Sequence, residues 1–225
     1  MSLWIKICGV TSPEEARLAV DAGADAVGMN LVPASKRHVD DETARAVVRA
    51  VGDDAEVVAV VADLSVEELR VLAARTGVHA LQLHGSEPPL AVAALGALAY
   101  QAVRIATAAD VVAARTFSGA RLLADAKVTG ELGGTGHAFD WTLVTELARE
   151  RPLVLAGGLT PENVGRAVEV VRPYGVDTAS GVEGTNPRRK DPDKVRRFID
   201  AARRAATALG LDSAPGVDYQ PRRNS

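Results

Sequence analysis

EVVAVVAD (56–63) and VHALQLHG (78–85) are short apolar runs, and a helical pattern over 65–76 separates them. Apolar runs of this kind, without polar alternation, are typical of strands that are buried on both faces. A strand, a helix and a second strand predict a parallel pair that is joined by a right-handed crossover.

This strand–helix unit repeats along the chain. Further strands are predicted over 3–9, 22–30, 100–105, 121–125, 152–158 and 176–181, and further helices over 12–22, 41–51, 87–97, 107–115, 140–150, 161–171 and 191–207. Eight units exceed the roughly five of an open flavodoxin-like sheet and predict an α/β fold of the closed (β/α)8 TIM barrel type. At the first helix, Ser12 is the expected N-cap, and Glu15 is placed to complete a capping box.

The barrel accounts for almost the whole chain. We expect one barrel domain over 1–207. Residues 208–225 combine Gly, Pro and Ser without apolar periodicity, so we expect a flexible C-terminal tail there.

The composition excludes several functional classes. Acidic residues number 29 against 26 basic ones, so the formal charge of −3 offers no basic surface for nucleic acid. No apolar run reaches the roughly 18 residues that a membrane span needs, and MSLWIKICGV (1–10) predicts a strand rather than a signal peptide. The single cysteine excludes an internal disulfide and a cysteine-rich metal site. We therefore expect a cytoplasmic protein that acts on a small molecule.

The carboxyl ends of the predicted strands carry the candidate chemistry, because catalytic groups of (β/α)8 barrels lie there and in the loops that follow. The polar, thiol and glycine residues at these positions are Lys6, Cys8, Asn30, Asp63, Gln82, His84, Arg104, Asp125, Lys127, Gly157, Gly158, Asp177, Ser180 and Gly181.

Glycines follow the seventh and eighth strands, in AGGL (156–159) and TASGVE (178–183). Loops at these two positions are the usual phosphate site of the fold, since glycine lets backbone N–H groups approach phosphate oxygens. Gly157, Gly158, Ser180 and Gly181 are therefore candidate phosphate-binding residues, and a phosphorylated small molecule is the expected partner. The alternative is that Gly157 and Gly158 only permit a tight turn.

A third glycine-rich segment, GELGGTGHAF (130–139), lies in an unusually long loop after the sixth strand. Long loops at a barrel mouth commonly act as lids or substrate clamps. Gly134 and Gly136 in this loop are further candidates for contact with the substrate phosphate.

Several segments together resemble one enzyme family. The segments are KICGVTSPEEA (6–16), SKRHV (35–39), ALQLHG (80–85), DAKV…GGTGHAFDW (125–141), LAGGLTPENV (155–164), RPYGVDTASGVE (172–183) and KDPDKVRRFI (190–199). With them the chain resembles phosphoribosylanthranilate isomerases, the barrel enzymes of tryptophan biosynthesis, from about Ile5 to Ala202. The resemblance implies an Amadori rearrangement of N-(5-phosphoribosyl)anthranilate to 1-(2-carboxyphenylamino)-1-deoxyribulose 5-phosphate, without a cofactor or a metal.

The resemblance also implies roles for single residues. Cys8 is the implied general base and Asp125 the implied general acid, which together provide the two proton transfers that the reaction needs. Arg37 is implied at the anthranilate carboxylate, with Asp177 near the same end of the substrate. Lys6 and His84 are further candidates for the anthranilate and ribose part, and Lys6 also for placing positive charge beside Cys8.

Each of these residues has a structural alternative. Cys8 can be a small buried hydrophobic residue, Asp125 can brace the long loop, and His84 can serve a structural role. The sequence departs from the family at His38, where an aromatic residue is usual, and at Ala179, where a hydroxyl often stands.

Three other functions remain open at this point. A dual-substrate isomerase typically pairs two aspartates, which Cys8 argues against. A ribulose-phosphate epimerase uses a metal held by His and Asp, and the four histidines offer no facing set of that kind. A barrel that binds a phosphorylated metabolite without catalysis would need neither Cys8 nor Asp125. Monomer and homodimer are both compatible with the sequence.

Overall fold

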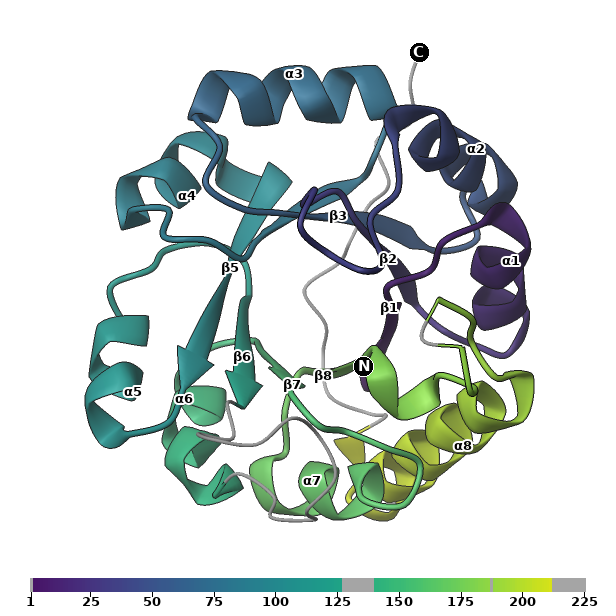
Figure 1. Ribbon diagram of the computed structural model, residues 1–225. Helices are drawn as coiled ribbons and strands as arrows, with labels where there is room; N and C mark the ends of the chain where they lie inside the picture. The colour runs from purple at the N-terminus through teal and green to yellow at the C-terminus, as the bar shows by residue number, and fades with distance from the viewer. Residues whose placement is uncertain (1, 127–139, 187, 212–225) are drawn as a thin grey trace.

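The computed structural model describes residues 2–126, 140–186 and 188–211. Eight parallel strands close into one barrel, with helices around the outside, which confirms the predicted (β/α)8 fold (Figure 1). The strands are Trp4–Cys8 (β1), Ala26–Asn30 (β2), Glu56–Val61 (β3), Ala80–Leu83 (β4), Ala99–Ile105 (β5), Leu122–Ala126 (β6), Leu153–Ala156 (β7) and Gly175–Thr178 (β8).

The α-helices follow the strands in alternation, as the sequence predicts. They are Pro13–Asp21 (α1), Asp41–Val51 (α2), Val66–Thr76 (α3), Pro89–Leu95 (α4), Ala108–Ala114 (α5), Thr145–Glu150 (α6), Val164–Val171 (α7) and Pro192–Ala208 (α8). Short 3₁₀ turns occupy Gly96–Leu98 (η1), Trp141–Val144 (η2) and Ser180–Val182 (η3). None of the helices among the described residues is long and apolar enough to cross a membrane.

Two hydrophobic layers hold the barrel together. The outer layer fills the space between sheet and helices, with fully buried residues such as Ile5, Met29 and Phe198. The inner layer fills the barrel itself with the residues Trp4, Ala26, Val58, Ala80, Tyr100, Ala102, Leu123, Val154 and Ala156. Several of these inner side chains are alanines, and they leave room for one long charged side chain, Lys6, which is also fully buried.

A cation closes the amino-terminal end of the barrel. The Arg121 guanidinium lies 4.7 Å from the centre of the Trp4 ring and 4.4 Å from the centre of the Tyr100 ring. Its Nη2 also donates to Glu56 Oε1 at 2.6 Å. Glu56 is only 5% exposed, so Arg121 compensates the charge of a buried carboxylate. This pair lies at the opposite end of the barrel from the candidate chemistry.

The predicted capping box of α1 is wrong. Ser12 is the N-cap, and its hydroxyl accepts from Glu15 N at 3.4 Å. The Glu15 carboxylate, however, accepts from Thr11 N at 2.8 Å and from Lys190 N at 2.9 Å. Glu15 therefore ties the first helix to the segment before α8 instead of closing the reciprocal cap.

The seventh helix starts three residues later than predicted, at Val164 instead of residue 161. Asn163 explains the difference, since its Oδ1 accepts from Thr160 N at 2.8 Å and its Nδ2 donates to Gly158 O at 2.9 Å. These bonds fold residues 160–163 into a turn that is braced against the loop after β7. The helix predicted over 140–150 likewise begins as the 3₁₀ turn η2, and Trp141 there packs against the outer core.

Candidate active site

A cavity of about 290 Å³ lies at the carboxyl ends of the strands. It brings together Cys8 at the end of β1, Asp125 in β6 and both glycine loops. Strands β1 and β6 lie three steps apart around the closed ring, as the sequence predicts. The residues around the cavity are Cys8, Asn30, Arg37, Val60, Gln82, His84, Leu123, Asp125, Ala156, Gly157, Gly158, Leu159, Asp177, Thr178, Ala179 and Ser180.

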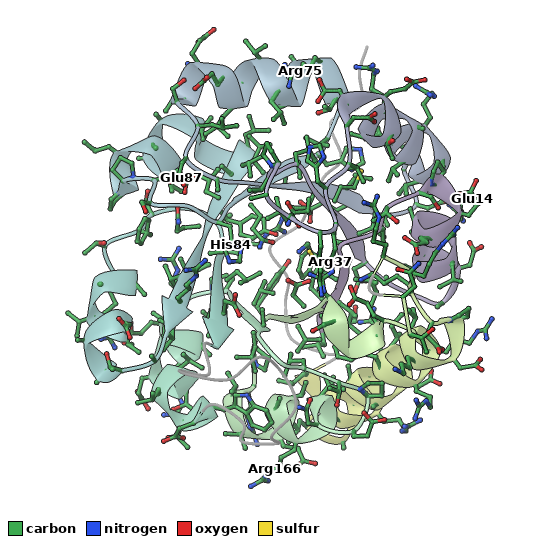
Figure 2. All side chains as sticks on the ribbon, in the orientation of Figure 1. Glu14, Arg37, Arg75, His84, Glu87 and Arg166 are labelled. Carbon is green, nitrogen blue, oxygen red and sulfur yellow. The ribbon has the colours of Figure 1, made fainter. Side chains whose placement is uncertain are left out.

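A larger hollow of about 800 Å³ adjoins this cavity and shares Asn30, Val60 and His84 with it. Arg104, an exposed residue of β5, lines the hollow beyond the shared residues. Figure 2 shows His84 and Arg37 near the middle of the barrel, whereas Arg75 and Arg166 lie at its rim.

Cys8 is buried at the wall of the cavity, 9% exposed. Its neighbour in the register of β2 is Gly28, where an added Cβ would lie 2.8 Å from Cys8 Sγ and 2.7 Å from Lys6 Cε. The missing side chain of Gly28 therefore leaves the space that the thiol and the lysine occupy. Burial raises the pKa of the Cys8 thiol, while the nearby cations Lys6 and Lys190 act in the opposite direction.

Lys6 lies beneath the cavity, and none of its area is exposed. Its Nζ donates to Gln82 Oε1 at 2.9 Å and to Asp177 Oδ1 at 3.2 Å. Burial alone would lower the pKa of Lys6, but charge interactions, with Asp177 first and Cys8 second, raise it above its usual value, so the ammonium stays charged. This geometry uses two of the three donors of Lys6 inside the barrel, and the predicted contact of Lys6 with the substrate stays a prediction. The geometry does place positive charge beside Cys8.

His84 lies at the cavity wall, beside Asp125 and Gln82. Its Nε2 lies 3.4 Å from Asp125 Oδ2, and its Nδ1 lies 3.2 Å from Gln82 Nε2. Both His84 and Asp125 are partly exposed to the cavity, with 24% and 32% of their side-chain areas accessible. Asp177 lines the same cavity while it is paired with Lys6.

Arg37 reaches the cavity from the loop between β2 and α2, and an acidic residue holds it there. Its Nε and Nη2 both donate to the carboxylate of Glu183, the latter to Oε2 at 3.0 Å. Lys190 Nζ shares this carboxylate at 3.4 Å and donates to Ala179 O at 3.0 Å. Two cations and one carboxylate leave a net positive charge at the edge of the cavity, which suits an anionic ligand.

Sequence reasoning missed Glu183 and Lys190. Both lie inside the motifs that carry the family resemblance, but no spacing links them to Arg37, which is 146 residues away from Glu183. Both side chains are buried, because each residue has only 6% of its area exposed to solvent. Burial would raise the pKa of Glu183, but Arg37 and Lys190 outweigh it and lower that pKa.

The glycines after β7 and β8 adopt conformations that other residues rarely reach. Gly157 and Gly158 have φ angles of +88° and +65°, so each needs the freedom of glycine. Beside Gly158 a Cβ would meet nothing within 4 Å, so open space lies against its backbone. Ser180 stands in η3 at the cavity wall, and Gly181 follows it in close contact with the loop after β7.

The sequence allowed two interpretations of Gly157 and Gly158, a tight turn or a phosphate site. This geometry is compatible with both. Gly134, Gly136 and Lys127 lie outside the described residues, together with most of the predicted long loop. Among the residues that the structure describes, no three His, Cys, Asp or Glu side chains form a group that could hold a metal ion.

Comparison with known proteins identifies the family that this chain resembles. The model of the family "N-(5'phosphoribosyl)anthranilate (PRA) isomerase" matches residues 5–201. The chain is 42% identical over 214 residues to the N-(5'-phosphoribosyl)anthranilate isomerase of Magnetococcus marinus, covering 94% of this chain and 100% of that protein.

Solved structures that are similar to this chain are described as enzymes of the same kind. The phosphoribosyl anthranilate isomerase of Thermotoga maritima has a TM-score of 0.81 and 39% identity, covering 89% of this chain and 98% of that one. A phosphoribosyl anthranilate isomerase in complex with reduced 1-(o-carboxyphenylamino)-1-deoxyribulose 5-phosphate has a TM-score of 0.77 and 36% identity over the same shares. A third structure, at 35% identity with a TM-score of 0.76 over the same shares of the two chains, is described as monomers derived from the dimeric enzyme of Thermotoga maritima.

Proposed function

The chain belongs to the N-(5'-phosphoribosyl)anthranilate isomerase family, and we propose on that basis how its own residues catalyse the reaction. The protein is an aldose–ketose isomerase of tryptophan biosynthesis. It converts N-(5-phosphoribosyl)anthranilate to 1-(2-carboxyphenylamino)-1-deoxyribulose 5-phosphate by general acid and base catalysis.

One observation supports the assignment of residues most strongly. A single cavity contains Cys8, Asp125 and both glycine loops, on different strands around the ring. The reaction needs a proton donor and a proton acceptor at opposite sides of one sugar, and this arrangement provides them.

Asp125 is the proposed general acid. Protonation of the ribose ring oxygen breaks its bond to C1′, and the nitrogen lone pair forms the iminium as the ring opens. The proton comes from the Asp125 carboxyl, which becomes a carboxylate. The partial exposure of Asp125 to the cavity gives the ring oxygen access to it.

Cys8 is the proposed general base. Removal of the C2′ proton from the iminium sends the C–H electrons into a new C1′–C2′ double bond and neutralises the nitrogen, which gives the enolamine. A thiolate is the form of cysteine that accepts this proton. Since burial raises the pKa of the Cys8 thiol, Lys6 and Lys190 have the task of stabilising the thiolate.

The two ends of the substrate are anions, and each has a proposed site. Backbone N–H groups at Gly157, Gly158, Ser180 and Gly181 are the proposed phosphate site, with room beside Gly158. Arg37, held by Glu183, is the proposed partner of the anthranilate carboxylate, because a planar guanidinium suits a planar anion. Asp177 and His84 complete the wall at that end, and Gly134 and Gly136 remain proposals from the sequence.

The remaining expectations are also proposals. We place the enzyme in the cytoplasm as a monomer or a homodimer, in one barrel domain. The predicted start of the tail at residue 208 is too early, because α8 runs to Ala208 and both Leu209 and Leu211 pack against the outer core. Residues 212–225 lie outside the described part of the chain. Sedimentation equilibrium distinguishes the two oligomeric states.

A fluorescence assay tests the function directly. Phosphoribosylanthranilate is generated in place from anthranilate and phosphoribosyl pyrophosphate, and its conversion is followed after the protein is added. We expect turnover that scales with protein concentration. A folded protein that binds phosphate esters without turnover would instead be a non-catalytic barrel.

A further inference from the structure

A continuous row of polar side chains crosses the barrel at the floor and wall of the substrate cavity; four of its five members line the cavity, and Lys6 lies beneath it. It runs from Asp177 to Lys6 at 3.2 Å, from Lys6 to Gln82 at 2.9 Å, from Gln82 to His84 at 3.2 Å, and from His84 to Asp125 at 3.4 Å. The row therefore links the side of the barrel that holds Cys8 to the proposed acid.

Lys6 fixes the orientation of the Gln82 amide. An ammonium group has only donors, so the atom that faces Lys6 Nζ must be the amide oxygen, Oε1. The Tyr100 hydroxyl donates to the same oxygen at 3.1 Å. Gln82 is 2% exposed, so no bulk water competes for these positions. The amide nitrogen Nε2 consequently faces His84.

This orientation in turn fixes the position of the His84 proton. Nε2 of Gln82 is a donor only, and it lies 3.2 Å from His84 Nδ1. Nδ1 must therefore offer its lone pair, and the ring proton lies on Nε2. That N–H faces Asp125 Oδ2 across 3.4 Å, a contact that is long for a hydrogen bond and of the kind that shortens when substrate binds.

We propose that His84 is a positioning residue for Asp125, and that Gln82 and Lys6 set its tautomer. The Nε2–H group engages Oδ2, so Oδ1 is the oxygen that carries the proton toward the sugar ring. When that proton leaves, the same N–H donates to the carboxylate that forms. Lys6 thus serves both proton-transfer groups, with its charge beside Cys8 and its hydrogen bond at the start of the path to Asp125.

The role of His84 in catalysis rests on the proposed function, but its tautomer does not. Nitrogen-15 NMR of the imidazole rings in the wild-type protein reads the tautomer without substrate, and the spectrum of His84→Gln identifies the His84 signals. We expect the Nε2–H tautomer at neutral pH. An Nδ1–H tautomer for His84 would overturn the inference even if the enzyme is fully active.

Two variants separate positioning from a purely structural role. In His84→Gln the amide nitrogen can occupy the Nε2 position and still donate to Asp125, whereas in His84→Asn the amide keeps only the contact with Gln82. We expect His84→Gln to retain at least a tenth of kcat, and His84→Asn to lose about 100-fold in kcat with little change in KM.

A third variant tests whether Gln82 sets the tautomer of His84. Gln82→Glu removes the donor that faces Nδ1, so we expect the His84 ring to lose the Nε2–H preference in the NMR spectrum and kcat to fall. Equal kcat values for His84→Gln and His84→Asn, or an unchanged tautomer in Gln82→Glu, would contradict the proposal. Absence of turnover in the wild type would contradict the proposed function instead.

Discussion

Gly181 has no room for a side chain, because a Cβ there would lie 1.9 Å from the carbonyl oxygen of Leu159 and 2.8 Å from Thr178 Oγ1. Thr178 Oγ1 also donates to Leu159 O at 2.7 Å, so the two loops meet at this point. We predict that Gly181→Ala lowers the free energy of unfolding by about 3 kcal/mol, since the backbone must move apart. Chemical denaturation measures this loss.

Gly165 provides the matched control. It lies inside α7, and a Cβ there would meet its nearest atoms at 3.8 and 3.9 Å, an ordinary contact. Gly165→Ala should therefore be neutral or stabilise the protein by up to about 1 kcal/mol, through the helix propensity of alanine. Equal destabilisation by both substitutions would contradict the close approach of the two loops.

Glu183 should make stability depend on pH in the acid range. The folded protein holds the pKa of Glu183 below its usual value of 4.5, so the unfolded chain binds this proton more tightly. Its stabilisation is therefore complete above pH 4.5 and is lost as the pH falls through the lower, folded pKa. Glu183→Gln leaves Arg37 and Lys190 without a counter-charge.

We predict that Glu183→Gln costs about 2 kcal/mol of unfolding free energy at neutral pH and raises KM, because Arg37 is no longer held. The difference between the two proteins should shrink below pH 4.5. Urea denaturation at several pH values measures it. A pH-independent difference would show that the carboxylate charge has no part in the effect.

At the scale of single residues, the position of a residue within its strand–helix unit indicated whether it could belong to the site. Cys8, Asp125 and Asp177 could be predicted as candidates because they lie at or one residue before the carboxyl ends of their strands, and these ends meet at one mouth of a (β/α)8 barrel. The contact of Glu183 with Arg37 and the contacts of Lys6 with Gln82 and Asp177 could not be predicted, because they join segments far apart in the chain. No local pattern encodes which buried cation a carboxylate will meet.

The capping box of α3 gives a prediction for a single helix. Ser65 accepts from Glu68 N at 3.3 Å, and the Glu68 carboxylate accepts from Ser65 N at 2.8 Å. Ser65→Ala should cost about 1 kcal/mol in thermal or chemical denaturation. Ser12→Ala should cost less, because Glu15 does not reciprocate at α1. A larger loss for Ser12→Ala would contradict this ranking.

Elements were predictable where apolar periodicity is strong, and α2 has the predicted bounds, Asp41–Val51. The start of α7 differs, because Asn163 offers the backbone a competing set of hydrogen bonds. The cap of α1 differs because Glu15 finds a tertiary partner at Lys190. In both cases a polar side chain bonds to backbone groups outside the expected helix start, nearby for Asn163 and distant for Glu15, and the sequence pattern does not resolve which groups these are.

At the scale of the molecule, the two ends of the barrel have separate tasks. The carboxyl end holds the cavity, while Arg121, between Trp4 and Tyr100, closes the amino-terminal end. Arg121→Met would leave the buried Glu56 without its cation, and we predict a loss of about 3–5 kcal/mol in unfolding free energy. The folded fraction should keep its kcat, because the cavity is remote.

Arg115→Met is the control for charge removal at the surface. Arg115 pairs with Glu150, and the side chains of both are more than 40% exposed. Its loss should cost much less unfolding free energy than the loss of Arg121, because solvent screens an exposed ion pair. If Arg121→Met proved equally mild, the cation would not be needed to close the barrel.

The architecture itself was the most predictable property. Strict alternation of apolar strands and helices leaves few ways to cover both faces of a parallel sheet, and eight units close it. The tail remains a prediction, since residues from 212 onward lie outside the described part of the chain.

The most direct test of the account measures kcat for Cys8→Ala and Asp125→Asn, together with the binding of a reduced product analogue to both. Loss of one proton-transfer group should lower kcat by about 10²–10⁴ in each variant, while the analogue still binds through the glycine loops and Arg37. Turnover near the wild-type level in Cys8→Ala would remove the proposed base, and the same result in Asp125→Asn would remove the acid.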